Sequence, residues 1–258
     1  MGRIQHYSMI NCAVNPQSAR ERVTAYEPVV RPRRVLIAGG GVAGCEAARV
    51  LAERGHKPEV FEVSDRLGGN LIPGGAPDFK EDDLLLAKWY ENELNRLGVP
   101  VTLNTAVTKE MAAEGGYDTV IVATGSRPKM FSLGDDDRVY SAEQVLNGQK
   151  ETGDTVAVVG GGLVGCETAL WLAKEGKKVT IVEALSGLMA VNGPICSANK
   201  EMLERLIPYN GIETICNARV TGFADGKLTA DTADGEKVIP ADSVILSVGY
   251  SSVADLYE

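Results

Sequence analysis

The sequence has little of what several common functions require. Only two of its 258 residues are histidine, so a histidine-based metal site or catalytic triad has almost nothing to draw on. Lysine and arginine (26) are outnumbered by aspartate and glutamate (35), and the net charge of −9 argues against nucleic acid or an anionic membrane as partner. No apolar run approaches the roughly 18 residues of a bilayer span, and the first residues lack the apolar stretch of a signal peptide. Five cysteines without a Cys-x-x-Cys pair do not indicate a disulfide framework, and a reducing cytoplasm fits best.

Glycine is the exception in an otherwise ordinary composition. Apolar residues make up 44% and charged residues 24% of the chain, as in a globular protein of one or two domains. Eight of the 29 glycines form two clusters, 39–44 and 160–165, which each follow a short apolar run and read Gly-Gly-Gly-x-x-Gly. The clusters are 121 residues apart (160 − 39), and Glu62 and Glu183 keep this offset. A second register, at an offset of 113, pairs Asn104 with Asn217 and Val107 with Val220, so the chain contains two copies of one supersecondary unit.

Each copy predicts a strand, a glycine turn, a helix and a second strand. Strands joined by helices of this length indicate right-handed crossovers and a parallel sheet. Asp225-Gly226 and Asp234-Gly235 predict hairpin turns, and therefore an antiparallel meander on the second sheet. The fold class is α/β, with two Rossmann-like dinucleotide-binding domains. The predicted strands are 34–38, 59–63, 120–123, 156–159, 179–183 and 244–248, and the predicted helices are 42–54, 81–97, 163–175 and 198–207.

Both clusters fit the G-x-G-x-x-G fingerprint of dinucleotide binding. In it the first glycine permits a tight turn, the second lets the backbone approach a pyrophosphate, and the third lets the helix pack on the strand. The N–H groups that open the helix then face the anion. Glu62 and Glu183, at the ends of the second strands, are expected to accept hydrogen bonds from the adenosine ribose. The residues expected to hold the two diphosphates are Gly39, Gly41, Val42, Ala43 and Gly44 in the first copy and Gly160, Gly162, Leu163, Val164 and Gly165 in the second.

Two dinucleotides in one chain predict electron transfer between a nicotinamide and a flavin. The first copy continues with Arg66-Leu67-Gly68-Gly69-Asn70, where the glycine pair admits a bulkier cofactor and Arg66 can lie against an adenine. The second copy has Leu185-Ser186-Gly187-Leu188 there, so we assign FAD to the first copy and the nicotinamide to the second. Glu183, with no arginine after it, disfavours a 2′-phosphate and so favours NADH over NADPH. Further cofactor contacts are expected from Arg66, Gly69, Asn70, Val107, Thr124, Gly125 and Gly249.

Several of these stretches, together with Cys12-Ala13-Val14-Asn15-Pro16 and residues 19–21, point to a known family. The sequence resembles the C-terminal half of the iron–sulfur flavoenzymes that include 2,4-dienoyl-CoA reductase and 2-enoate reductase. The resemblance covers nearly the whole chain and looks closest to 2-enoate reductase in residues 68–77. Its other marks are the two glycine turns, Arg66 to Asn70, and Ala123-Thr124-Gly125.

The resemblance implies an oxidoreductase module that passes electrons from NADH to FAD. In that family an N-terminal barrel with FMN and a [4Fe-4S] cluster reduces an activated C=C bond, as in enoates and enoyl- or dienoyl-CoA esters. The expected partner is therefore this missing barrel, and FMN and [4Fe-4S] are expected in the full-length protein. Cys12 matches the last of four cluster ligands, but one thiolate cannot hold a cluster alone. No catalytic side chain is expected in this half.

The expected domain organisation follows from the repeat and the resemblance. Residues 1–30 show no clear periodicity and are expected to form an extended arm. An FAD-binding domain at 31–140 is followed by an NADH-binding domain at 141–247, and residues 248–258 begin the return into the first domain. The sequence leaves the oligomeric state open.

Two other functions remain open at this point. A pyridine-nucleotide disulfide oxidoreductase needs two exchanging thiols beside the flavin, and no cysteine follows Gly69 until Cys166. A non-catalytic module would bind ADP or a dinucleotide only to stabilise an assembly, because fold and motif do not prove chemistry. Cys45 and Cys166 are expected to be small packing residues at the start of their helices.

Overall fold

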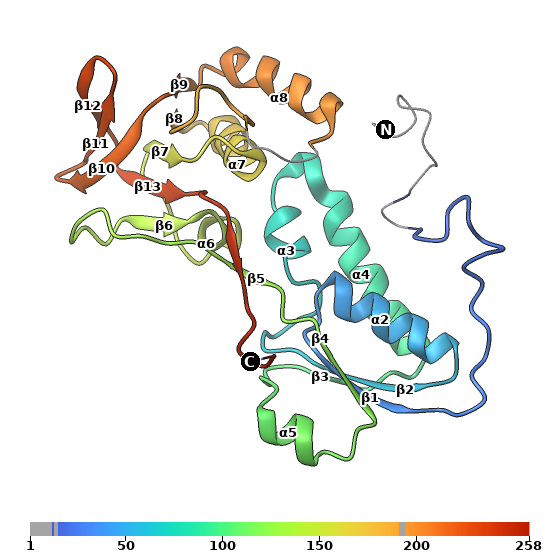
Figure 1. Cartoon of the computed structure of the whole chain (residues 1–258). Helices are drawn as coiled ribbons and strands as arrows, with labels where there is room; N and C mark the ends of the chain where they lie inside the picture. The colour runs from blue at the N-terminus through green and yellow to red at the C-terminus, as the bar shows by residue number, and fades with distance from the viewer. Residues whose placement is uncertain (1–11, 13–14, 191–194, 258) are drawn as a thin grey trace. The chain divides into compact units, whose positions relative to one another are not determined.

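Each copy of the repeat forms its own compact unit in the computed structural model, which describes residues 12, 15–190 and 195–257 (Figure 1). The first unit runs to Arg127 and resumes at Ser252, and the second unit comprises Pro128–Ser251. These divisions differ from the expected boundaries at 140 and 247. The second unit begins earlier because Leu133 is buried in its core and accepts from the N–H of Phe223. The following strand β6 (Val139–Ser141) pairs in parallel with β13 (Ser243–Leu246) and so belongs to its sheet.

The first unit is built on a parallel sheet in the order β3-β2-β1-β4. Its strand β1 (Arg34–Ala38) pairs with β2 on one side and β4 on the other. Its apolar side chains are covered on both faces of the sheet, and Leu36 and Ile37 are fully buried. The chain then turns through the first glycine cluster into α2 (Val42–Glu53), so the cluster lies at the carboxyl end of the sheet. The remaining elements are β2 (Lys57–Phe61), α3 (Leu71–Gly74), the 3-10 helix η1 (Asp78–Lys80), α4 (Glu81–Arg96), β3 (Val101–Thr102), α5 (Lys109–Glu114) and β4 (Thr119–Val122).

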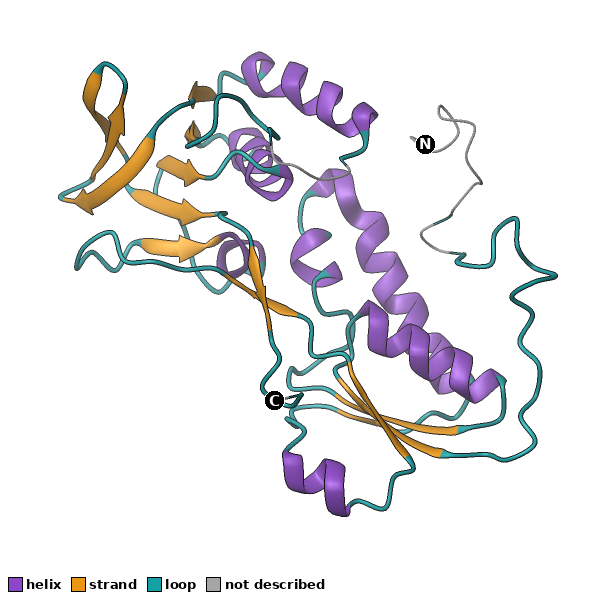
Figure 2. Cartoon of the chain, viewed as in Figure 1, coloured by secondary structure: helices purple, strands orange, loops and turns teal. Residues whose placement is uncertain are grey.

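The second unit repeats this plan in a five-stranded parallel sheet, ordered β6-β13-β7-β8-β9 (Figure 2). The second glycine cluster again joins the first strand of the copy to its helix. Asp225 (φ +49°) and Gly226 (φ +72°) form the expected first hairpin of an antiparallel meander, since both residues adopt the left-handed conformation. The elements are α6 (Ala142–Leu146), β7 (Thr155–Val159), α7 (Leu163–Lys174), β8 (Lys178–Val182), α8 (Ser197–Tyr209), β9 (Glu213–Ile215), β10 (Arg219–Ala224), β11 (Lys227–Thr232) and β12 (Gly235–Pro240).

The α/β class, the two parallel sheets and the meander are therefore as predicted. The strands that precede the two acidic residues end slightly earlier than expected, at Phe61 and Val182. Glu62 and Glu183 are thus the first residues beyond their strands. The chain enters the second unit through β5 (Ser126–Pro128) and leaves it through β14 (Tyr250–Ser252), and these two strands pair with each other. None of the helices in the described ranges is long and apolar enough to cross a membrane.

The predicted extended arm is only partly extended. Residues 1–11 and 13–14 lie outside the described residues. Residues 15–24 form hydrogen-bonded turns, in which the Gln17 side chain donates to the carbonyl of Thr24 (2.5 Å) and the Thr24 hydroxyl donates to the carbonyl of Arg20 (3.0 Å). Residues 25–29 then run without regular structure towards β1.

The second register of the repeat is visible in the backbone. Asn104 and Asn217 both have φ +52°, a left-handed conformation that asparagine tolerates better than most side chains. The N–H of Asn104 donates to the carbonyl of Ser64, and that of Asn217 donates to the carbonyl of Leu185, each at 2.9 Å. Each asparagine therefore fixes the loop that follows one of the two acidic residues.

This conformation predicts the cost of replacing either asparagine. Asn104→Ala and Asn217→Ala should each lower the free energy of unfolding by about 1 kcal/mol, because alanine is strained at positive φ. Asn104→Gly and Asn217→Gly should be close to neutral, since glycine adopts this region freely. Thermal unfolding of the four variants measures the difference, and equal stability of each alanine and glycine pair would contradict it.

Candidate functional site

The first glycine turn is packed so tightly that three of its positions exclude side chains. Gly39 has φ +111°, and a Cβ there would collide with the carbonyl oxygen of Ala123 at the end of β4. A Cβ on Gly44 would collide with the carbonyl oxygen of Gly39. The middle residue, Gly40, is also buried, and a Cβ there would lie 3.1 Å from the Cβ of Glu62 and collide with Leu67. The turn therefore brings α2 directly against β1 and β4.

The second turn has the same geometry. Gly160 has φ +106°, and its Cβ would collide with the carbonyl oxygen of Ser247 just after β13. A Cβ on Gly165 would meet the carbonyl oxygen of Gly160, and one on Gly161 would lie 3.2 Å from the Cβ of Glu183. Gly40 and Gly161 are x positions of the fingerprint, so sequence reasoning missed their constraint. The signal was present, because both copies have three consecutive glycines.

The outer side of each turn is open. A Cβ on Gly41 would reach only the Cα of Gly69, at 3.8 Å, and one on Gly162 would meet nothing within 4 Å. These glycines are the N-caps of α2 and α7, and neither helix has a side-chain cap or an acidic residue in its first turn. The opening N–H groups are therefore free to bind an anion, which the helix dipole also favours. Accessible backbone at a helix N-terminus suits an anion such as a diphosphate, and the binding role of Gly41–Gly44 and Gly162–Gly165 stays a prediction.

Glu62 and Glu183 are buried beside their turns and hold them in shape. One carboxylate oxygen of Glu62 accepts from the N–H of Gly40 (2.6 Å), and the other accepts from the N–H of Ser64 (2.8 Å). Glu183 does the same with Gly161 (2.5 Å) and Leu185 (2.7 Å). Both residues are buried, with 7% of Glu62 and 8% of Glu183 exposed. The remaining lone pairs can accept from the vicinal hydroxyls of a ribose.

The loops that follow the acidic residues are also alike, although their sequences are not. Gly68 (φ +118°) donates its N–H to the carbonyl of Gly40 at 2.9 Å. In the second unit Met189 (φ +51°) donates to the carbonyl of Gly161 at 2.7 Å, although it is a buried methionine. The two sequences match poorly here because the shared feature is a backbone conformation and a backbone hydrogen bond, not a glycine. The structure places Leu188-Met189 where the first unit has Leu67-Gly68.

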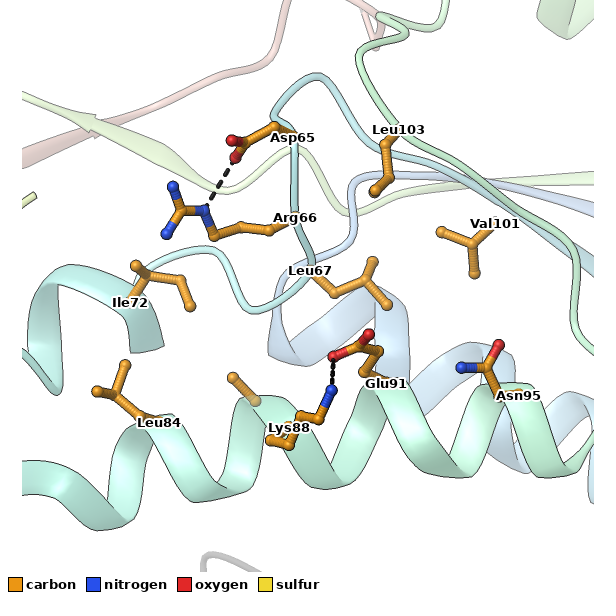
Figure 3. Close-up of a pocket in the computed structure, with 11 residues that line it drawn as sticks. Asp65, Arg66, Leu67, Ile72, Leu84, Lys88, Glu91, Asn95, Val101 and Leu103 are labelled. Carbon is orange, nitrogen blue, oxygen red and sulfur yellow. Dashed lines mark hydrogen bonds and ion pairs between the residues drawn. The ribbon is translucent and has the colours of Figure 1, made fainter.

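Arg66 lies at the rim of a pocket of about 400 Å³ in the first unit (Figure 3). The pocket lies next to the ends of β2 and β3 and against α4, and Arg66 forms an ion pair with Asp65 at 2.9 Å. Lys88 and Glu91 of α4 pair with each other at 2.8 Å on the opposite side. Leucine, isoleucine, alanine and valine side chains form much of the lining, and the four charged residues add groups of both signs. Such a pocket suits a flat aromatic ring with polar edges. The lining residues are Asp65, Arg66, Leu67, Ile72, Leu84, Ala87, Lys88, Glu91, Asn95, Val101 and Leu103.

The other predicted contact residues lie at strand ends and in loops. The hydroxyl of Thr124 donates to the carbonyl of Val253 (2.6 Å), and Gly125 (φ +69°) accepts from the N–H of Val253 (3.0 Å). This connection holds the returning C-terminal segment at Val253 against the segment after β4. Gly69 and Asn70 are exposed beside the turn, Val107 is half-buried in the loop after β3, and Gly249 (φ +94°) is exposed after β13. Leu163 and Val164 open α7.

The two helix cysteines are packing residues, as predicted. Cys45 and Cys166 are fully buried, and their thiols lie 3.1 Å and 3.4 Å from the carbonyls of Gly40 and Gly161. Burial, with a smaller effect of the adjacent glutamate, raises the pKa of each thiol to about 12. A thiol with that pKa is not a thiolate near neutral pH and cannot exchange disulfides there.

Cys12 is half-buried, and all five cysteines are free thiols. Within the described part of the chain, no group of three or more histidine, cysteine, aspartate or glutamate residues is arranged to hold a metal ion. A [4Fe-4S] cluster needs four thiolates, so the described residues alone do not fit one. The role of Cys12 as a cluster ligand stays a prediction.

Comparison with known families and relatives agrees with the duplicated site. The family model described as pyridine nucleotide-disulphide oxidoreductase matches residues 110–258, and that of an NAD(P)-binding Rossmann-like domain matches residues 37–82. Cinnamate reductase of Clostridium sporogenes is 48% identical over 257 residues, which is all of this chain and 39% of that protein. NADH oxidase of Thermoanaerobacter brockii is 34% identical over 98% of the chain and 40% of that protein.

One solved structure is similar over nearly the whole chain. A 2-naphthoyl-CoA reductase in complex with 2-naphthoyl-CoA matches with a TM-score of 0.88 at 27% identity, over 96% of this chain and 38% of that one. The chain therefore spans about two fifths of the length of the relatives that it matches.

The packing of the turns predicts a difference between their glycines. Gly44→Ala and Gly165→Ala should lower the free energy of unfolding by about 1–3 kcal/mol or more, because each new methyl collides with a rigid carbonyl. Gly41→Ala and Gly162→Ala are the matched controls, since their methyl groups point into open space, and they should change stability by less than about 1 kcal/mol. Chemical denaturation of the four variants compares them, and similar losses at all four positions would refute this view of the turns.

Proposed function

The chain belongs to the pyridine nucleotide-disulphide oxidoreductase family, and we propose that within it the chain is an electron-entry module that passes electrons from NADH to FAD. It corresponds to the FAD- and NAD(P)-binding part of reductases of the 2-enoate reductase type, as the resemblance implied. The single observation that carries the proposal is the duplicated cradle, in which each open glycine turn has its own buried carboxylate. One cradle would be sufficient for a simple dehydrogenase.

We assign FAD to the first unit. Gly68 and Gly69 lie directly against Gly41, with Gly41 and Gly68 in a backbone bridge, so no side chain narrows this edge of the cradle. The diphosphate would bind at the start of α2 and the ribose at Glu62. From Glu62 the next space towards β3 is the pocket beside Arg66, where we place the adenine. Thr124 and Gly125, at the end of β4, would contact the cofactor on the opposite side of the turn.

We assign NADH to the second unit. Gly160, Gly162 and the start of α7 would hold its diphosphate, and Glu183 would accept from both ribose hydroxyls. The exposed residues after Glu183 are Ala184 and Leu185, so no cation is placed there to neutralise a 2′-phosphate. The relative named NADH oxidase supports the same choice.

Positioning is the main contribution of this chain to the chemistry. Bound FAD supplies a two-electron acceptor for the hydride of NADH. The backbone N–H groups of the two turns neutralise the diphosphates, and the two glutamates fix the riboses, so that each reactive ring is held at the end of an anchored chain. No side chain of this module is proposed to donate a proton in the reaction.

We further propose that the whole protein is a reductase of activated C=C bonds, of the enoate or enoyl-CoA type. The similar proteins named cinnamate reductase and 2-naphthoyl-CoA reductase support this class. The C=C chemistry would take place in a further domain with FMN and a [4Fe-4S] cluster, to which Cys12 would contribute one ligand. The disulfide alternative is disfavoured, because Cys45 and Cys166 are buried with strongly raised pKa values.

Reconstitution tests the proposal directly. The chain loaded with FAD under anaerobic conditions should lose its oxidised-flavin absorbance when one equivalent of NADH is added, and NADPH should act more slowly. Gly162→Ala is the variant to compare. Its methyl group should leave the fold intact but obstruct the diphosphate of NADH, and so slow the bleaching. A flavin-loaded chain that NADH does not bleach would instead indicate a non-catalytic dinucleotide-binding module.

The carboxylate of Glu183 predicts the coenzyme preference. Glu183→Ala combined with Ala184→Arg should shift the ratio of NADPH to NADH affinity by about tenfold or more, since it replaces like-charge repulsion with an ion pair. Glu62→Ala is the control, because the same change in the first unit should weaken FAD and leave the coenzyme preference unaltered. Titration of both coenzymes against each variant measures the ratio, and an unchanged ratio in the double variant would remove Glu183 from this role.

A further inference from the structure

The side chain of Arg49 attaches the segment that follows Cys12 to α2. Arg49, on α2, has a side chain that is only 11% exposed, and its guanidinium donates to the hydroxyl of Tyr26 at 2.9 Å. Its central carbon lies 5.3 Å from the ring centre of Tyr26 and 5.8 Å from that of Trp89 on α4. One side chain therefore joins the arm, α2 and α4, and all three belong to the first unit.

Two carboxylates of α2 hold the guanidinium in this position. Glu46 accepts two hydrogen bonds from Arg49, at 2.8 Å and 2.9 Å, and Glu53 forms an ion pair with it at 3.1 Å. The hydroxyl of Tyr90 also donates to Glu46, at 3.4 Å. The contacts with Glu46 and, to a smaller extent, with Tyr26 raise the pKa of Arg49 above its usual value, against the effect of burial. The planar fork of arginine can make all of these contacts at once, whereas a lysine ammonium cannot.

The described residues of the arm bury little apolar surface. None of its described residues, 12 and 15–30, is buried, and Val23 and Val30 are 87% and 96% exposed. Apolar burial therefore contributes little to its attachment. Arg54 also contacts the arm: its carbonyl accepts from the N–H of Val29 (2.9 Å), and its side chain donates to the carbonyl of Glu27 (3.3 Å). Both contacts lie at the C-cap of α2, and Tyr26, which Arg49 holds, is the next contact along the chain towards the turns at 15–24.

We propose that Arg49 is a positioning residue that clamps the arm to α2 through Tyr26. Because α2 also carries the first glycine cradle, the clamp sets where the arm lies relative to the FAD that we assign to that cradle, and in this respect the inference rests on the proposed function. The arm leads back to Cys12, the residue predicted to bind an iron–sulfur cluster. The clamp therefore orients the segment between α2 and Cys12, along which electrons are expected to pass from FAD to the cluster.

Hydrogen exchange of the full chain, without added nucleotide, tests the clamp. Arg49→Met should raise the amide exchange of residues 15–27 by about tenfold or more, since a loss of charged hydrogen bonds of this kind frees the segment to open locally. Tyr26→Phe, which removes only the hydroxyl, should have a smaller effect in the same residues. Trypsin should cleave after the exposed Arg22 faster in both variants. Unchanged protection of the arm in Arg49→Met would overturn the proposal.

Two further variants separate a clamp from a general stabiliser of the helix. Arg96→Met is the matched control, because Arg96 also pairs with Glu53, at 3.9 Å, while its shorter ion pair is with Glu93 of its own helix; it should leave the arm unchanged. Arg49→Lys should fail to restore protection, because it keeps the charge but loses the fork. Full rescue by lysine, or faster exchange in α2 to the same extent as in the arm, would overturn the positioning role. FAD binding is measured on separate samples. A chain that does not bind FAD contradicts the proposed function, whereas the exchange result alone shows whether Arg49 holds the arm.

Discussion

The hydrogen bond between a buried glutamate and the N–H in the middle of a glycine turn is the interaction on which both sites depend. Gly40 and Gly161 are buried, and their N–H groups would lack a partner without Glu62 and Glu183. A buried unpaired N–H costs about 1–3 kcal/mol, so the carboxylate maintains the turn before any ligand arrives. The same group that would bind the ribose therefore also shapes the surface for the diphosphate, and the site needs little ordering on binding.

The duplication of this arrangement separates the chain from a single-cofactor protein. Each unit closes its turn with backbone contacts that no side chain can replace, and each leaves its helix N-terminus open. The differences lie in the loops after the glutamates, where one unit has a pair of glycines and the other a buried methionine. Similar backbones with different loops are what two different dinucleotides require, because the diphosphates are alike and the remaining parts are not.

Much of the fold could be predicted from the sequence, because glycine spacing and short apolar runs are local signals. The two turns, the helices that follow them and the hairpin at Asp225-Gly226 are of this kind. The match between Gly68 and Met189 could not be predicted, because their shared feature is a backbone hydrogen bond and a left-handed φ, not a residue type. The membership of β6 in the second sheet is not visible in the sequence, because β6 has only three residues and its membership depends on pairing with a strand about a hundred positions away. The attachment of Tyr26 to Arg49 is likewise a contact between distant elements.

The pairing of β5 with β14 has a consequence for how such a protein can be assembled. The chain enters the second unit along β5 and leaves it along β14, so the two ends of the unit lie side by side in one two-stranded ribbon. A block of sequence with adjoining ends can be exchanged as a cassette, because a short turn can rejoin the host once the block is removed. Recombination could in this way replace the coenzyme specificity of a flavoprotein without altering the sheet that holds its flavin.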